Sequence, residues 1–301
     1  MNGIREIILH DTNKYEKRGI CLYERETWKL VVCENGNENQ STHFNVDLDV
    51  LTIGPYLLNQ NHFITHIYLN EFLEEIDDYA FSSMGQLKMI IIPKRVRRIG
   101  KGVFSFTTSL ETIYYFGEKT PECSNDVFES VENDIEIIVS EKYKDETFCG
   151  RPVTKNLKTS EKCGEMIWCF VVGKDDGNEL MIEGMGSTFD YSTGIQPLHH
   201  SYEISRISIS KMISYVHSSL IGENKSVERI TVDEGNRDII SENGIIYENE
   251  MSELLFYPPS LTNILFEMKS TVQYVHQHAF RRNDHLEVIK VMSEKVNFEE
   301  K

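Results

Sequence analysis

An apolar pattern that returns every 23 positions through the first half of the chain constrains its fold more than any other feature. One column of this pattern contains Phe44, Ile67, Ile90 and Ile113. Other columns keep the same spacing: Val46, Leu69, Ile92 and Tyr115; Val50, Leu73 and Val96; Ile53, Ile76 and Ile99; Leu58, Phe81, Phe104 and Val127. A fixed period of about 20 to 50 residues is typical of stacked units that are each too small to bury their own apolar face. The pattern therefore predicts a solenoid.

Each repeat also predicts the local structure of one coil. Ile90 and Ile92 alternate around Ile91, which is the period of two expected of a strand with one face turned inward. Pro93 follows directly, and it belongs at the exit of the strand because proline lacks the N–H that a sheet requires. Two contacts are expected: parallel pairing of the strands that hold Ile67, Ile90 and Ile113, and stacking of Phe81 on Phe104.

The second half of the chain repeats the same period. Two pairs lie 23 positions apart, namely Ile207 with Ile230 and Phe266 with Ile289. Between these pairs, Gly244–Ser260 contains two apolar runs around a polar turn, which predicts a β-hairpin. Gly19–Glu34, near the N-terminus, has the same form. The chain is therefore expected to contain two short arrays with hairpins beside them.

Two segments share a more specific pattern of residues. They are IIIPKRVRRIGKGVFSFTTSLETI (Ile90–Ile113) and FEMKSTVQYVHQHAFRRNDHLEVIKV (Phe266–Val291). Both resemble the unit of the BspA-like leucine-rich repeat family, roughly I-x-I-P-x-x-V-x-x-I-G-x-x-A-F. Lys162–Tyr191 is similar to the N-terminal leader of that family, and Phe116–Val153 is similar to its C-terminal cap. The resemblance implies a leucine-rich-repeat fold, and it implies a surface role because the best-known members are surface adhesins and antigens.

The predicted fold class is mainly β: a leucine-rich-repeat solenoid with short parallel strands, in two arrays with β-hairpin leader units. We assign residues 1–43 to an N-terminal hairpin or cap, residues 44–158 to the first array with its C-terminal cap, and residues 159–301 to a leader hairpin and the second array. The polar stretch Lys155–Lys162 is interpreted as a linker that a protease should cut first. No recognisable cap follows Val291, so the last strand edge is expected to be open.

The charge of the chain narrows the range of partners. It contains 48 acidic and 31 basic side chains, which gives a net charge of −17. Such a chain repels phosphate backbones and anionic lipid, so nucleic-acid binding and direct membrane insertion are not expected. The predicted partner is a protein or a glycan, and no cofactor is expected.

Six cysteines are scattered along the chain. They are fewer than a scaffold of this size held together by disulfides would contain, and no Cys-x-x-Cys motif is present. We interpret them as partly buried free thiols, with disulfide bonds as the alternative. They are Cys21, Cys33, Cys123, Cys149, Cys163 and Cys169.

The location of the protein stays open at this stage. Met1–Arg18 lacks the apolar core of about 7 residues that a secretory signal requires. The apolar run Met89–Ile92 is far shorter than the roughly 20 residues of a membrane span. These features make the cytoplasm the default, whereas the family resemblance favours the cell surface.

No motif in the sequence supports catalysis or metal binding. Gly184-Met185-Gly186 lacks the third glycine of a dinucleotide site. Asp175-Asp176-Gly177-Asn178 fits a hairpin turn better than a calcium loop. His276 and His278 point the same way along an extended segment, but zinc would need a third ligand. The sequence therefore predicts a protein that is not an enzyme and holds no metal.

The outward positions of the first array suggest a binding face. Tyr68, Ile91 and Tyr114 occupy one outward column, with Met89 and Phe116 beside it. On an open sheet these side chains would form an apolar patch that a partner could bury. The alternative is that the face is covered, for example by the N-terminal hairpin, because parallel sheets are commonly buried on both sides.

Basic side chains cluster beside this predicted face. Arg95, Arg97 and Arg98 flank the inward Val96 and Ile99, so they should project outward together. They could form a charged rim for an acidic partner, or simply a solvated turn. The predicted function is a non-enzymatic, macromolecule-binding protein of the surface-antigen type, and the alternative is a cytoplasmic protein–protein scaffold.

Overall fold

The structure is a computed structural model that describes residues 6–10, 12–34, 41–191, 197–221 and 224–298. These residues form short strands joined by turns, with a 3₁₀ turn (η1, Leu198–Ser201) and a helical turn (α1, Ser218–Ile221). The chain forms two compact units, Met1–Asn156 and Leu157–Lys301. The boundary between the units falls inside strand β15 (Thr154–Gly164).

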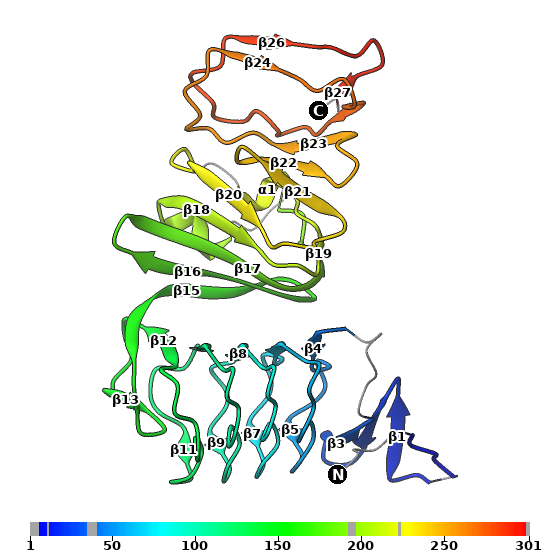
Figure 1. The fold of residues 1–301 in the computed structure, drawn as a ribbon, viewed down its shortest axis with the longest axis vertical. Coiled ribbons are helices and arrows are strands. Elements are labelled where there is room, and N and C mark those ends of the chain that lie inside the picture. The colour runs from blue at the N-terminus through cyan, green and yellow to red at the C-terminus, as the bar shows by residue number, and fades with distance from the viewer. Residues whose placement is uncertain (1–5, 11, 35–40, 192–196, 222–223, 299–301) are drawn as a thin grey trace. The chain divides into compact units, whose positions relative to one another are not determined.

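In the first unit, each coil contributes one strand to each of two parallel sheets (Figure 1). The first sheet includes β4 (His43–Asn45), β6 (His66–Tyr68), β8 (Met89–Ile92), β10 (Thr112–Tyr115) and β12 (Glu136–Ser140). The second includes β5 (Thr52–Ile53), β7 (Glu75–Ile76), β9 (Arg98–Ile99) and β11 (Glu122–Cys123). Ile67 pairs with Ile90, and Ile90 pairs with Ile113, all in parallel. The predicted register and the predicted solenoid are confirmed.

The N-terminal hairpin extends the second sheet. It consists of β1 (Tyr15–Arg18), β2 (Cys21–Glu24) and β3 (Lys29–Cys33), which pair antiparallel in sequence order. Parallel pairing of β3 with β5 attaches this hairpin to the edge of the second sheet. The hairpin predicted for Gly19–Glu34 is confirmed, but it is not the cover considered for the outward face of the first sheet.

Aromatic side chains fill the centre of successive coils. The rings of Phe81 and Phe104 stack with centroids 6.2 Å apart, as predicted, and Phe104 stacks on Phe128 at 5.4 Å. Phe81 and Phe104 are fully buried. Burial of one such side chain stabilises the fold by roughly 1.5–3 kcal/mol, so this column is a main source of cohesion between coils.

The turn beside this core has an unusual backbone. Tyr56, Tyr79 and Gly102 occupy equivalent positions and have φ angles of 58°, 56° and 59°. This left-handed region costs an L residue roughly 1–2 kcal/mol, and only glycine enters it freely. The Tyr56 and Tyr79 rings stack at 5.3 Å. A Cβ atom at Gly102 would lie 2.3 Å from the Tyr79 ring, so the packing of this ring favours glycine there, and glycine also adopts the positive φ without strain.

The second unit begins with a long antiparallel leader. Strand β15 pairs with β16 (Met166–Lys174), and β16 pairs with β17 (Gly177–Ser187). Lys174 pairs with Gly177, so Asp175 and Asp176 form a two-residue turn. The predicted hairpin turn is confirmed.

Coils follow this leader. In parallel register, β17 pairs with β18 (Ile204–Ile209) and β19 (Ile213–Tyr215), and β18 pairs with β20 (Arg229–Val232). An antiparallel meander contains β21 (Ile239–Glu242), β22 (Ile245–Glu248) and β23 (Glu253–Phe256), which confirms the predicted hairpin at Gly244–Ser260. The last strands are β24 (Leu265–Glu267), β25 (Tyr274–Val275), β26 (Val288–Lys290) and β27 (Asn297–Phe298).

The expectation of a linker at Lys155–Lys162 is wrong. These residues belong to β15, whose backbone pairs with β16 through contacts such as Ser160 with Phe170. Polar side chains on a strand with one solvated face resemble the composition of a linker, and composition alone does not separate the two. Preferential proteolysis at this stretch is therefore no longer expected.

The interpretation of the cysteines as free thiols is also wrong. All six form disulfide bonds, which join Cys21 to Cys33, Cys123 to Cys149 and Cys163 to Cys169. The spacing of the cysteines did not reveal the first two bonds, because their partners are far apart in sequence. The antiparallel pairing of β2 and β3 brings Cys21 to Cys33, and the folding back of the cap brings Cys123 to Cys149. One signal was available in the sequence: Cys21 and Cys33 lie near the two ends of the predicted hairpin, and in the structure they pair directly across it.

Candidate binding surfaces

The predicted outward column of the first array, which contains Tyr68, Ile91 and Tyr114, is present in the structure, but its side chains are not exposed. Tyr68 pairs with Ile91, and Ile91 pairs with Tyr114. Their side chains are only 2%, 0% and 9% exposed, and Met89 and Phe116 are buried as well. All four residues of β8 are buried, as is typical of a parallel strand covered on both faces. These side chains are buried in the structure, and recognition by them stays a prediction that requires them to become accessible.

Two histidines lie on the adjoining outward column. The rings of His43 and His66 stack with centroids 4.5 Å apart and planes 5° apart. His66 Nδ1 lies 2.7 Å from the Thr65 hydroxyl. Burial, helped by the positive charge of Lys88, lowers the pKa of His66 to about 4. His66 is therefore neutral at physiological pH, which suits an apolar face.

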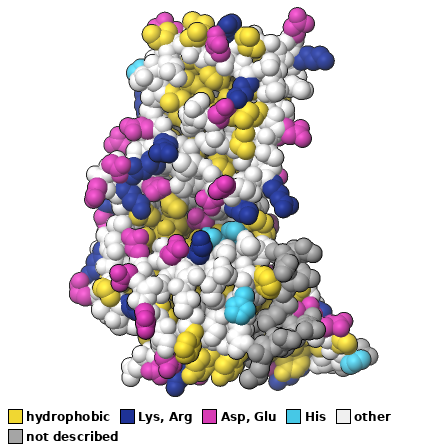
Figure 2. All heavy atoms as spheres, viewed as in Figure 1, with side chains coloured by type: hydrophobic (Ala, Val, Ile, Leu, Met, Phe, Trp, Pro, Cys, Tyr) yellow, Lys and Arg dark blue, Asp and Glu magenta, His cyan; other side chains and the backbone are white. Residues whose placement is uncertain are grey.

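The predicted basic rim is neutralised within the first unit. Arg98 belongs to β9 of the second sheet, so it does not adjoin the ladder on the first sheet. Glu75 pairs with both Arg97 (3.2 Å) and Arg98 (3.1 Å). The Arg95 guanidinium lies 5.2 Å from the centre of the Phe72 ring. Figure 2 shows basic and acidic side chains interspersed over the drawn face. The ion pairs of Arg97 and Arg98 with Glu75 favour the solvated turn, and the charged rim stays a prediction.

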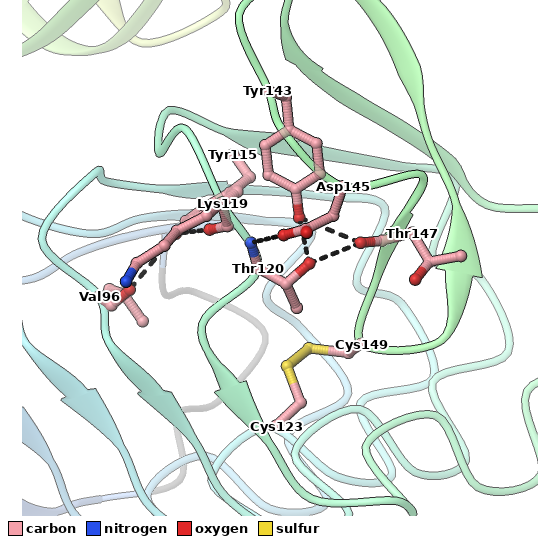
Figure 3. The surroundings of a disulfide bond; sticks show 9 residues. All are labelled: Val96, Tyr115, Lys119, Thr120, Cys123, Tyr143, Asp145, Thr147 and Cys149. Atoms are coloured by element: carbon pink, nitrogen blue, oxygen red, sulfur yellow. Dashed lines mark hydrogen bonds between the residues drawn. A yellow bond between two sulfur atoms is a disulfide. The ribbon is translucent and has the colours of Figure 1, made fainter.

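A cap closes the C-terminal end of the first array. Strand β12 adds to β10 in parallel, and β13 (Thr147–Phe148) and β14 (Arg151–Pro152) form a short antiparallel pair. Cys123, at the end of β11, is bonded to Cys149, which lies between β13 and β14 (Figure 3). The cap is therefore tied covalently to the last coil that it covers.

Thr120 organises the polar contacts beside this disulfide (Figure 3). Its N–H donates to the Asp145 carboxylate at 2.7 Å, which lowers the pKa of Asp145. Its hydroxyl lies 2.6 Å from the Tyr143 hydroxyl and donates to the Thr147 carbonyl at 2.6 Å. Tyr115 packs edge-on against Tyr143, and burial raises the pKa of the Tyr115 phenol. These contacts satisfy the Thr120 N–H and the hydroxyl groups of Thr120 and Tyr143 inside the cap.

Arg151 ends the aromatic column of the first array. Its guanidinium lies 5.3 Å from the centre of the Phe128 ring and donates to the carbonyl oxygens of Val131 and Asn133. A shallow hollow of about 390 Å³ remains beside Phe128. It is lined by Asn125, Asp126, Phe128, Glu129, Cys149, Gly150 and Arg151. The sealed end therefore presents mostly polar groups.

The end of the second array is different. Strands β26 and β27 are the terminal strands of their sheets within the described part of the chain (orange to red in Figure 1). Ile289 occupies the column of Ile113 but is 37% exposed, whereas Ile113 is 0% exposed. Val291 occupies the column of Tyr115 and is 44% exposed, and Phe298 on β27 is 51% exposed. Positions that are core in the first array are thus open to solvent here.

A cavity of about 430 Å³ lies beside Phe280, the last aromatic residue of the second core. Phe298 forms another wall, so the cavity has apolar surfaces at two sides. Its lining is Val275, His276, Gln277, His278, Phe280, Arg281 and Phe298.

Gly184, Asp176 and His276, which belong to the motifs considered above for cofactor or metal binding, have structural roles. Gly184 has a φ of 137°, and a Cβ atom there would lie 2.1 Å from the Met166 carbonyl oxygen. Asp176 in the hairpin turn pairs with Arg206, which lowers the pKa of Asp176. Both ring nitrogens of His276 contact protein groups: Nδ1 lies 2.9 Å from the Tyr215 hydroxyl, and Nε2 lies 3.0 Å from Glu253.

Among the residues that the structure describes, no group of three or more His, Cys, Asp or Glu side chains could hold a metal ion. Within the same residues, no helix combines the length and apolar character that crossing a membrane requires.

Comparison with known families agrees with the coils. Residues 36–149 match the model for a BspA type leucine rich repeat region, in six copies. Residues 36–149 are therefore similar to a BspA-type leucine-rich repeat region. The match covers the first array and most of its cap, which confirms the family resemblance. No curated protein is significantly similar to the chain in sequence.

Solved structures of leucine-rich repeat proteins are similar at low identity. A leucine-rich repeat protein from Eubacterium ventriosum is 13% identical, with 95% of this chain and 60% of that chain covered and a TM-score of 0.33. The pneumococcal vaccine antigen PcpA is 13% identical, with 96% and 70% covered and a TM-score of 0.29. A leucine rich cell surface protein from Faecalibacterium prausnitzii is 12% identical, with 96% and 76% covered and a TM-score of 0.26. The chain spans less than two thirds of the first of these proteins.

Proposed function

We propose that this protein is a non-enzymatic repeat scaffold that resides in an oxidising compartment outside the cytoplasm and binds another macromolecule. The observation that carries the location is the pairing of all six cysteines. Disulfides form and persist in oxidising compartments and are rare in the cytosol, where thiols are kept reduced. The alternative of a cytoplasmic scaffold therefore has less support.

The positions of the disulfides strengthen this proposal. Cys21–Cys33 lies in the N-terminal hairpin, Cys123–Cys149 ties the cap of the first array, and Cys163–Cys169 joins the first strands of the second unit. Each bond fixes an element beside the repeats, and the coils between them are held by apolar burial. Repeat arrays need capped ends to stay soluble. Disulfide bonds that fix the elements beside the repeats therefore suit a protein exposed to harsh surroundings.

The binding role is supported by the scaffold. Stacked coils expose an extended surface on a rigid backbone, which repeat proteins commonly use to bind partners. The motifs that could have indicated catalysis are occupied by turn and packing roles, as Gly184 and Asp176 illustrate.

The test of location uses native protein from its source cells. Thiols are blocked during lysis under denaturing conditions, and a second reagent labels cysteines after reduction. The proposal predicts no labelling by the first reagent and labelling of all six cysteines by the second. Protease treatment of intact cells should also remove the protein while a cytoplasmic marker survives. Blocking of the cysteines before reduction, together with full protection from protease, would favour the cytoplasmic scaffold.

A further inference from the structure

We propose that the disulfide bond between Cys123 and Cys149 is a site of thiol–disulfide exchange, at which a small external thiol attacks the Cys149 sulfur from the hollow beside Phe128. The bond opens in the folded chain, while the other two disulfide bonds stay closed. This inference goes beyond the proposed function and does not depend on it, because it concerns how the bond reacts when a thiol is supplied.

The three disulfide bonds differ in how far solvent reaches them. Cys123 and Cys149 are both partly exposed. Exchange requires that a thiolate reach a sulfur atom, so a bond between buried cysteines reacts slowly and an accessible bond reacts first. The cysteines of the other two bonds are each at most 5% exposed, namely Cys21, Cys33, Cys163 and Cys169.

Cys149 lies at the tip of a short hairpin (Figure 3). Phe148 pairs with Arg151, so Cys149 and Gly150 form the two-residue loop between β13 and β14. Their φ angles of 48° and 86° place both loop residues in the left-handed region, as in the tightest hairpin turns. A Cβ atom on Gly150 would meet nothing within 4 Å, so there is open space beside the loop.

The hollow beside Phe128 provides a route to this loop. Its volume of about 390 Å³ is large enough to admit the thiol end of a small molecule. Cys149 belongs to the lining of the hollow, whereas Cys123 does not. A thiol that enters the hollow therefore meets the Cys149 side of the bond.

The charges that line the hollow act on an incoming thiolate. Arg151 contributes a positive guanidinium to the lining. The Asp126 carboxylate is paired with the Lys101 ammonium at 3.4 Å, which offsets its charge. Glu129 is the other acidic side chain of the lining, and it is exposed. The Glu129 carboxylate opposes the approach of a thiolate, so replacing it with a cation should speed the attack.

The exchange step balances without any further reactant. The sulfur of the small thiolate forms a bond to the Cys149 sulfur, while the bond between the two cysteine sulfurs breaks. The bonding electron pair leaves with Cys123 as a thiolate, which takes up the proton that the small thiol had released to water. The products are a mixed disulfide at Cys149 and a free thiol at Cys123, and the small thiol is the reductant.

The probe is reduced glutathione, added to the intact oxidised chain in the absence of oxygen. An excess of N-ethylmaleimide stops the reaction at early times, and peptide mass analysis locates both reagents. We expect glutathione on Cys149 and the maleimide on Cys123. This bond should open at least about tenfold faster than the other two, because their sulfur atoms are exposed only when the surrounding structure opens.

Two charge variants test the route of attack. Glu129→Lys places a cation in the hollow and should speed the exchange by about threefold. Glu132→Lys is the matched control, because it changes the net charge equally at an exposed position outside the lining. Its rate should stay within about 1.5-fold of the unaltered chain. Both side chains are exposed, so both variants should fold, and circular dichroism checks this.

Each outcome decides the proposal. Glutathione on Cys149, together with faster exchange in Glu129→Lys than in Glu132→Lys, supports the exchange site. Equal rates of opening at all three bonds overturn it, as does glutathione found mainly on Cys123. Equal rates in the two variants also overturn it, because the thiol would then not approach through the hollow.

Discussion

The two arrays share one repeat but end in opposite ways. The first closes on β12, a disulfide, a network around Thr120 and a guanidinium over Phe128. The second ends, within the described residues, on β26 and β27, with Ile289 and Val291 exposed. The difference teaches that the repeat supplies cohesion between coils, whereas solubility and order at an end depend on what covers the last coil.

The largest expected effect concerns the two aromatic columns. Phe104→Ala should destabilise the first unit by about 3–5 kcal/mol, because a fully buried ring leaves a cavity between two stacked neighbours. Phe280→Ala should destabilise the second unit by only about 1–2 kcal/mol, because the ring is half-buried beside an open cavity. Denaturant unfolding of each variant measures both values. Equal losses would remove the distinction between the ends.

The disulfide of the cap should have the next largest effect. Replacing Cys123 and Cys149 together by alanine should destabilise the first unit by about 2–4 kcal/mol, since the bond closes a long loop in the unfolded chain. Thermal unfolding under non-reducing conditions measures the change. An unaltered transition would mean that the cap holds by packing alone.

Much of this comparison could be anticipated from the sequence. The 23-residue period fixes the register of Ile67, Ile90 and Ile113 because each inward column must stay continuous for the core to form. Local alternation and turn residues also predicted the hairpins, since they depend on neighbours in the chain.

Other features depend on contacts that the sequence does not encode locally. Burial of Tyr68 and Tyr114 requires knowledge of what covers a sheet, and a pattern of alternation cannot supply this. The Cys123–Cys149 bond depends on how the cap folds back. The neutralisation of Arg98 depends on Glu75 one coil away, which became visible only once the register was known.

Acid should destabilise the first unit through His66. Its pKa is lowered to about 4 from an ordinary 6.5, so the unfolded chain binds more protons between these values. Stability is therefore complete above pH 6.5 and falls as the pH drops toward 4, by at most about 3.4 kcal/mol. His66→Gln should flatten this dependence, and the same change at exposed His285 of the second unit is the control. A dependence that both variants retain would exclude His66 as its source.

The smallest expected effect concerns the cation at the sealed end. Arg151→Lys keeps a charge near Phe128 but loses the planar fork that reaches two carbonyl oxygens. A loss of about 1 kcal/mol is expected in the first unit. Denaturant midpoints provide the measurement, and a gain in stability would show that the fork strains the cap.

Hydrogen exchange of backbone amides tests the contrast between the ends most directly. The sealed end predicts slow exchange at Ile113 and Tyr115 on β10, whose N–H groups face β12. The open end predicts fast exchange at Ile289 on β26 and at Phe298 on β27, where described partners lie on one side only. Protection at Ile289 equal to that at Ile113 in the isolated chain would contradict the account.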